Sequence, residues 1–190
     1  MNGQVEVLAW IKEQAPNQWN QWAQNQSFLG FQMAALNGHL DVLQWYKDNV
    51  TEAGWKAMVS SNHYAVFSYA AKQGNVDVMQ WLKHHSPKDV WLEMVAADDY
   101  LGFRWACQFG HLKALHWFEA NVKEEVSNMI AASNHGAIQK AHEHQQADVL
   151  SWLLHYKAAN RTNLGLFARS KKEPHEDARQ HSLSETMLIN

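Results

Sequence analysis

The histidines are the side chains in this sequence best suited to metal chemistry, since there are 12 of them in 190 residues. The densest group comprises His135, His142, His144 and His155. Histidines that bind one metal ion from a helix lie three or four residues apart, whereas the two-residue separation of His142 and His144 turns their side chains about 160° apart. The sequence contains neither an H-E-x-x-H motif nor paired cysteines, so we predict no metal site and no cofactor. A metal-binding or enzymatic protein that uses the region from His135 to His155 is the alternative.

Cys107 is the single cysteine of the sequence. The sequence has no G-x-S-x-G motif and no glycine-rich phosphate loop to accompany it. Cys107 takes a repeat position that Ala35 and Ala71 fill elsewhere, which predicts a buried structural thiol. We therefore predict no catalytic residue and a protein that is not an enzyme. A lone cysteine also excludes an intrachain disulfide and favours a reducing compartment.

Ten tryptophans could form a stacking platform or a cage for a ligand. Five of them share one position of a repeat, which packing between repeats explains: Trp10, Trp45, Trp81, Trp117 and Trp152. Trp105 differs, since it takes a position that Met33 and Tyr69 fill in other repeats. It is the tryptophan that we expect at a binding surface.

These side chains belong to a repeat that the string NGHLDVLQW, at residues 37–45, represents best. Related strings begin at residues 2, 73, 109 and 144: NGQVEVLAW, QGNVDVMQW, FGHLKALHW and HQQADVLSW. Their anchor residues are Gly3, Gly38, Gly74, Gly110 and Gln145, which are 35, 36, 36 and 35 residues apart. A period held this closely predicts stacked structural units.

Each repeat predicts three short helices, named A, B and C here. Helix A precedes the glycine, as in FQMAALNG at residue 31, and has its phenylalanine and two alanines on one face. Helix B follows, as in HLDVLQWYK, and its apolar residues cover more than half of its circumference, which predicts burial between repeats. Helix C contains TEAGWKAMVSS, PKDVWLEMVAA and KEEVSNMIAAS. Ser86 and Asn121 are the expected N-caps of the second and third of these helices.

The predicted fold class is all-α, a helical repeat solenoid of four to five units of 35–36 residues. We expect the repeat domain to cover residues 1–157. Residues 158–190 abandon the period and are polar, which predicts a disordered tail or a loosely docked cap. The first repeat has no helix A ahead of its glycine, so one hypothesis is that the chain is a fragment of a larger protein whose activity lies elsewhere.

The pattern A-A-x-x-G-H-L-D-V-L at residues 34–43 resembles an ankyrin repeat, and the resemblance extends over residues 1–157. Two features depart from that family: a phenylalanine-containing start replaces threonine-proline-leucine-histidine, and the segment that forms a β-hairpin in ankyrin repeats looks helical. Ankyrin repeat proteins bind other proteins, so the resemblance implies a protein–protein interaction module.

The resemblance also implies that the two residues before each anchor position line a concave binding face. In this sequence these residues are Leu36, Asn37, Lys72, Gln73, Gln108, Phe109, Glu143 and His144. Phe109 is a large apolar residue outside the packing pattern, which favours a role in recognition. With Trp105, these residues form the predicted partner-binding surface.

Sixteen basic and nineteen acidic residues give a formal net charge of −3, which offers no general attraction for nucleic acid or for an anionic membrane surface. No stretch approaches the roughly 18 apolar residues of a membrane span. We therefore predict a cytoplasmic monomer with a protein partner, without nucleic-acid or membrane binding. The polar C-terminus ending in MLIN resembles signals of type IV secretion, so a further hypothesis is a bacterial effector secreted into a host cell cytosol.

Overall fold

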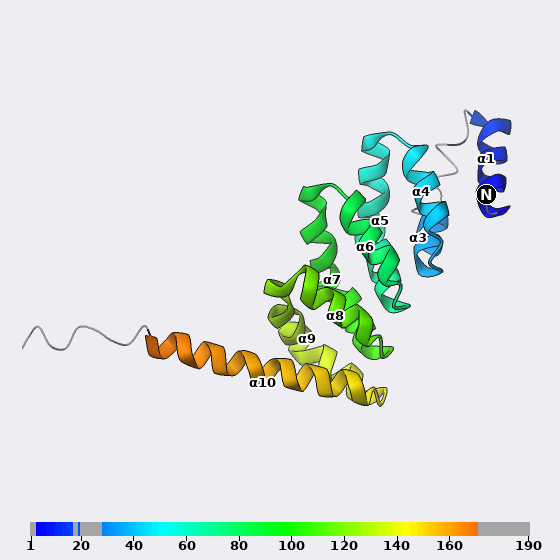
Figure 1. The fold of residues 1–190 in the computed structure, drawn as a ribbon. Helices are drawn as coiled ribbons and strands as arrows, with labels where there is room; N and C mark the ends of the chain where they lie inside the picture. Colours follow the sequence, from blue (N-terminus) through cyan, green and yellow to red (C-terminus); the bar gives the residue numbers. More distant parts are fainter. Residues whose placement is uncertain (1–2, 17–18, 20–27, 171–190) are drawn as a thin grey trace, which may run out of the picture. The chain divides into compact units, whose positions relative to one another are not determined.

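The computed structural model describes residues 3–16, 19 and 28–170, with side chains described up to residue 160. The described elements are α-helices, and no strand occurs among these residues (Figure 1). The helices are α1 (Gly3–Gln14), α3 (Leu29–Leu36), α4 (Leu40–Asp48), α5 (Glu52–Lys72), α6 (Val76–His85), α7 (Lys88–Gln108), α8 (Leu112–Asn121), α9 (Lys123–Glu143) and α10 (Ala147–Ser170). The predicted all-α class is confirmed.

Helices α5, α7 and α9 are each interrupted by four residues that leave the helical conformation, at 61–64, 97–100 and 132–135. We call these segments the junction turns. In each one, an extended residue is followed by three residues with positive φ, such as Asn62, His63 and Tyr64 at 48°, 55° and 59°. Asparagine, aspartate and histidine tolerate positive φ best among residues with a side chain, and they supply six of the nine such positions. Each long helix is therefore a predicted helix C followed by the helix A of the next unit.

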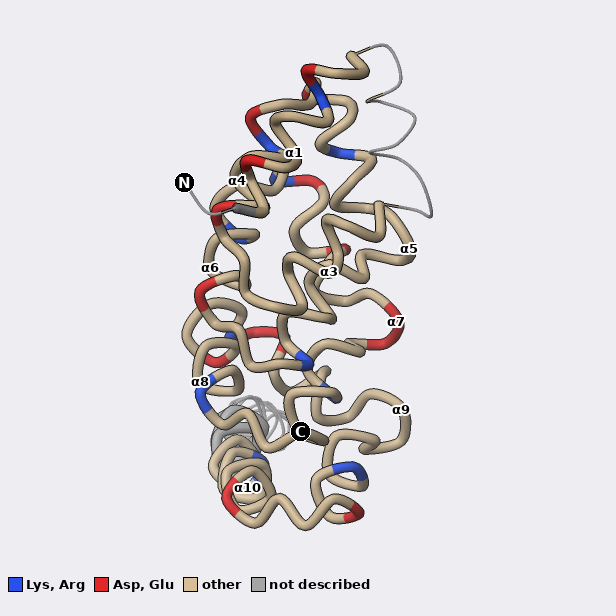
Figure 2. The backbone as a smooth tube through the Cα atoms, turned by 90° about the vertical axis from the view of Figure 1, so that its right-hand side faces the viewer, with Lys and Arg blue, Asp and Glu red and all other residues tan. Residues whose placement is uncertain are grey.

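The chain divides into two compact units, Met1–Ser151 and the part from Trp152 onward. Within the first unit, contacts join α3 to α5, α5 to α7 and α7 to α9 in one row, and α1 to α4, α4 to α6 and α6 to α8 in another (Figures 1 and 2). Figure 2 also shows acidic and basic residues dispersed along both rows. Helix α10 continues past the predicted domain boundary at residue 157 to Ser170. The predicted secretion signal lies in residues 171–190, outside the described residues.

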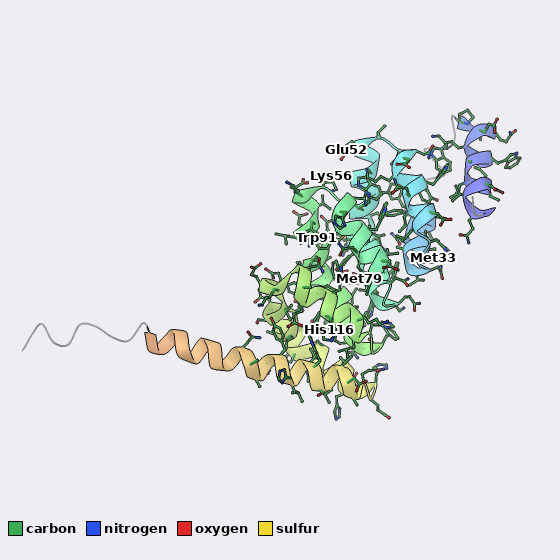
Figure 3. The ribbon with its side chains drawn as sticks, viewed as in Figure 1. Met33, Glu52, Lys56, Met79, Trp91 and His116 are labelled. Atoms are coloured by element: carbon green, nitrogen blue, oxygen red, sulfur yellow. The ribbon has the colours of Figure 1, made fainter. Side chains whose placement is uncertain are left out.

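The buried residues of the core recur at the same positions in each sequence repeat. The phenylalanines that begin each helix A, Phe31, Phe67 and Phe103, are at most 1% exposed. In helix B the same is true of Leu43, Met79 and Leu115, of which Met79 is labelled in Figure 3. Cys107 is fully buried, and this burial raises the pKa of its thiol, as expected of a structural cysteine.

Tryptophans at the end of helix B connect neighbouring units through their indole groups. The Nε1–H of Trp81 donates to Gln44 Oε1 at 3.1 Å, and that of Trp117 donates to Gln80 Oε1 at 2.6 Å. Trp117 is 7% exposed, so packing between repeats accounts for it as predicted. Trp10 differs, since 61% of it is exposed.

The anchor glycines end helix A with positive φ, as the sequence predicts: Gly38 at 77°, Gly74 at 67° and Gly110 at 78°. Gln145 adopts 56° in the same position. The residue after each anchor extends its side chain toward the preceding unit. Asn75 Nδ2 donates to the backbone oxygen of Leu36 at 2.8 Å, and His111 Nε2 donates to that of Lys72 at 2.8 Å.

The two N-caps predicted for helix C are wrong. Pro87 occupies the N-cap of α7, and Ser86 instead ends α6 with a buried hydroxyl that makes no hydrogen bond to a described residue. Asn121 is the last residue of α8, where its Nδ2 donates to the backbone oxygen of Trp117 at 2.8 Å. The spacing between helices B and C is so short that these polar residues complete the preceding helix. Thr51 does cap its helix, accepting a bond from the amide of Gly54 at 3.1 Å.

Side chains of the junction turns bond to the neighbouring unit. His63 Nδ1 lies 3.0 Å from Asp98 Oδ1, and Ser133 donates to Asp99 Oδ2. Tyr100 donates to Glu125 Oε2 at 2.6 Å. The bond to the Glu125 carboxylate raises the pKa of Tyr100 from 10.0 to about 12, and the same bond lowers the pKa of Glu125.

Glu125→Gln is expected to return the pKa of Tyr100 toward 10, because the substitution removes the carboxylate that favours the neutral phenol. In the unmodified protein, Tyr100 should stay protonated over the pH range in which an ordinary phenol ionises. An NMR titration of ¹³C-labelled tyrosine checks both statements. Glu124→Gln is the matched control, and an equal effect of the two substitutions would contradict the pairing of Tyr100 with Glu125.

Candidate protein-binding surface

The predicted binding residues lie on the last turn of helix A and the turn that follows it. Asn37, Gln73, Phe109, Glu143 and His144 are exposed at this edge of the array. Leu36, Lys72, Trp105 and Gln108 are half-buried. Packing therefore leaves a position of each unit, from the second to the fifth, available to another molecule.

A stacked aromatic pair forms the centre of this row. The rings of Tyr69 and Trp105 have centroids 5.9 Å apart and planes inclined by 7°. The two residues take the same position of helix A in successive units, so the stacking of units brings them face to face. The ammonium of Lys72 lies 5.1 Å from the centroid of the Trp105 ring, within the range of a cation–π interaction.

Phe109 extends this aromatic surface onto the turn. It is 40% exposed, and its centroid lies 5.6 Å from Lys72 Nζ. The rings of His111 and His144 lie 6.5 and 6.3 Å from it. We call Tyr69, Lys72, Trp105 and Phe109 together the aromatic strip.

The other predicted residues are not part of this cluster. Asn37 Nδ2 donates to the backbone oxygen of Met33 in its own helix at 2.8 Å. Glu143 accepts a bond from Lys140 at 2.7 Å, and this bond lowers the pKa of the Glu143 carboxyl. The structure thus brings Lys72, Trp105, Phe109 and His144 together, whereas Leu36 and Asn37 lie one unit before Lys72 along the chain.

The architecture matches a known repeat structure. The match is to an X-ray structure of an ankyrin repeat family protein from Legionella pneumophila, with a TM-score of 0.57 and 25% sequence identity, over 75% of this chain. The chain is a divergent ankyrin-like repeat protein. It spans 41% of the length of that ankyrin repeat chain. No family model matches the sequence, and no curated protein matches it either.

In this ankyrin-like array, a helix C stands in place of the β-hairpin, as the sequence predicts, and a junction turn separates it from the next helix A. Tyr69 is a member of the aromatic strip that the sequence analysis missed. The signal was available, because Tyr69 shares its repeat position with Trp105, one unit earlier. No group of three or more histidine, cysteine or acidic side chains is placed to hold a metal ion in the part of the chain that the structure describes.

Proposed function

We propose that this ankyrin-like array binds a partner protein through the aromatic strip. The observation that carries the proposal is the clustering of two stacked rings, a cation and an exposed phenylalanine at positions where the repeat pattern does not require them. Tryptophan and tyrosine side chains carry much of the binding energy of protein interfaces when a partner removes them from water. The ankyrin-like fold supports an interaction module in general, since it presents these positions on a rigid scaffold.

The pairing of Tyr69 with Trp105 supports the proposal further. Two rings held parallel by stacking of the units lose little conformational freedom when a partner binds. Lys72 stays beside Trp105 and Phe109, so the strip combines apolar area with a positive charge. A partner segment with an apolar side chain beside a carboxylate would complement both features.

Phe109→Asp is expected to weaken binding of the cognate partner at least about tenfold, because a carboxylate would replace an apolar contact that the partner covers. The melting curve should stay unchanged, since Phe109 is outside the core. The measurement is affinity capture with wild-type and variant arrays, followed by calorimetry with each partner that the variant loses.

Leu92→Asp is the matched control, because Leu92 is 61% exposed but lies in the helix C part of α7. A protein that binds the aromatic strip should be captured by the wild-type array and by the Leu92→Asp array, but not by the Phe109→Asp array. Capture that all three arrays share would place the interface elsewhere and reject the assignment of the strip.

The remaining sequence hypotheses stay predictions. The metal or enzymatic role of the region from His135 to His155 has no candidate ligand set among the described side chains. No described helix is long and apolar enough to cross a membrane. The effector and host-secretion hypothesis depends on residues 171–190, which the structure does not describe.

A further inference from the structure

Three hydrogen-bond donors belong to the aromatic strip: the hydroxyl of Tyr69, the ammonium of Lys72 and the indole N–H of Trp105. We call these three groups the donor cluster. The rings of Tyr69 and Trp105 are stacked with centroids 5.9 Å apart, and the Lys72 ammonium lies 5.1 Å from the Trp105 centroid. Among the residues that the structure describes, none accepts a hydrogen bond from the donor cluster. The strip therefore has donors without acceptors.

Several donors of the same types find acceptors elsewhere in the array. The junction-turn hydroxyls of Tyr64 and Tyr100 donate to the carboxylates of Glu93 and Glu125. Three indole groups donate to oxygen atoms of neighbouring helices, those of Trp55, Trp81 and Trp117. The chain thus twice pairs a tyrosine hydroxyl with a carboxylate, whereas no described residue does so for Tyr69.

The donor cluster also carries a positive charge that no described carboxylate balances. The ion pairs of the described side chains do not include Lys72. Glu143 is the one acidic residue among the predicted binding positions, and it pairs with Lys140 at 2.7 Å. The strip is therefore locally positive, although the formal net charge of the whole chain is −3.

The chemistry of these groups selects an anionic acceptor. An ammonium and an indole N–H can only donate, so a ligand that satisfies them must offer several lone pairs. A carboxylate offers these lone pairs together with a negative charge, and hydrogen bonds to a charged acceptor are the stronger kind. The three side chains are half-buried, which strengthens a charge interaction relative to one on a fully exposed surface.

We propose that the donor cluster binds a carboxylate of an acidic partner segment, in which an aspartate or glutamate adjoins an apolar residue that covers Phe109. This inference rests on the proposed function of the aromatic strip and defines the chemistry of its partner. Lys72 and the Tyr69 hydroxyl are then the groups that select for acid. A nucleic-acid phosphate is the less favoured ligand, because nucleic-acid sites follow the strand with several basic residues and the strip has one lysine.

The test is a selection of random peptides from a display library on the full chain, which needs no known partner. Peptides retained by the wild type but not by Phe109→Asp are ligands of the aromatic strip. We expect these peptides to be enriched in aspartate or glutamate next to an apolar residue. Peptides that ignore Phe109→Asp bind elsewhere and are set aside.

Lys72→Gln is expected to weaken binding of the best acidic peptide about tenfold, and Tyr69→Phe about threefold. Tyr69→Phe removes the hydroxyl and keeps the ring that stacks on Trp105. Replacing the acidic residue of the peptide by its amide should cost about tenfold on the wild type and little more on Lys72→Gln, because the two changes remove one interaction. Fluorescence anisotropy of labelled peptides measures each affinity.

Lys88→Gln is the matched control, since it removes the same charge from an exposed position in the helix C part of α7. It should leave peptide binding unchanged. An equal loss for Lys88→Gln and Lys72→Gln would reduce the effect to net charge and overturn the proposal.

The remaining outcomes separate this proposal from the proposed function. Peptides that require Phe109 but show no acidic preference would overturn the acidic partner and leave the binding role of the strip in place. A library without any Phe109-dependent peptide would reject both. Tighter binding of single-stranded oligothymidine than of the acidic peptide, lost in Lys72→Gln, would assign the donor cluster to nucleic acid instead.

Discussion

Phe67→Ala is expected to lower the free energy of unfolding by about 3–5 kcal/mol, the range for removing a fully buried phenylalanine. Phe67 is completely buried, and its ring lies 5.5 Å from Trp91, 6.0 Å from Trp117 and 5.8 Å from Phe118. These neighbours belong to two successive units, so the cavity would weaken both a unit and its interface with the next. Urea unfolding followed by circular dichroism measures the loss.

The control for that measurement is Phe109→Ala, which removes the same side chain from an exposed position. We expect it to cost less than about 1 kcal/mol. The slope of the unfolding free energy against urea concentration must also be compared between the variants and the wild type, because repeat arrays can unfold in parts. Equal losses for the two variants would mean that the helix A phenylalanines do not form the core.

Gly74→Ala is the second substitution with a large expected effect, a loss of about 2 kcal/mol or more. A side chain at φ 67° is strained, and the added Cβ would lie 2.7 Å from His111 Nδ1 and 3.2 Å from His111 Cβ. The ring would have to move, and its bond to the backbone oxygen of Lys72 would be broken. Thermal and urea unfolding both test this expectation.

Gly38→Ala separates the two contributions. Gly38 has a similar φ of 77°, but an added Cβ would meet the Asn75 side chain at an ordinary 3.4 Å. Gly38→Ala should therefore lower the free energy of unfolding only by the cost of the strained φ, about 1–2 kcal/mol. The reverse change, Gln145→Gly, should stabilise by at most about 1 kcal/mol, since it relieves strain at the same repeat position. A Gly74→Ala variant no less stable than Gly38→Ala would show that His111 adapts freely.

The repeat itself made most of the fold predictable. Phenylalanine and alanine recur at helical spacing before each glycine, and a residue type that recurs at one position is constrained by packing. Hence the three helices of each unit, the buried Cys107 and the glycine turns were all expected. The three successive residues with positive φ in each junction turn were not expected. The only sequence signal for these turns is the tolerance of asparagine, aspartate and histidine for positive φ.

The candidate surface was only partly predictable, for a physical reason. Variation at their repeat positions identified Trp105 and Phe109. Tyr69 joins them because its ring stacks on Trp105 of the next unit, and sequence spacing does not show the orientation of a ring. The exposure of Trp10 was missed because its repeat position predicts burial. That prediction assumes a preceding unit, whose helix B would supply the glutamine acceptor and whose helix C would pack on the indole, and the described residues place none there.

The bonds from tryptophan to glutamine run in one direction along the chain, with the donor always in the later unit. The unit that contains Gln80 and Trp81 therefore presents a glutamine acceptor at one end and an indole donor at the other, whereas His116 takes the glutamine position in the next unit. A duplicate of that unit inserted beside the original would find a matching group at both new seams. Gene duplication can lengthen such an array without any compensating substitution, which gives a direct physical route to proteins of the same design with more units.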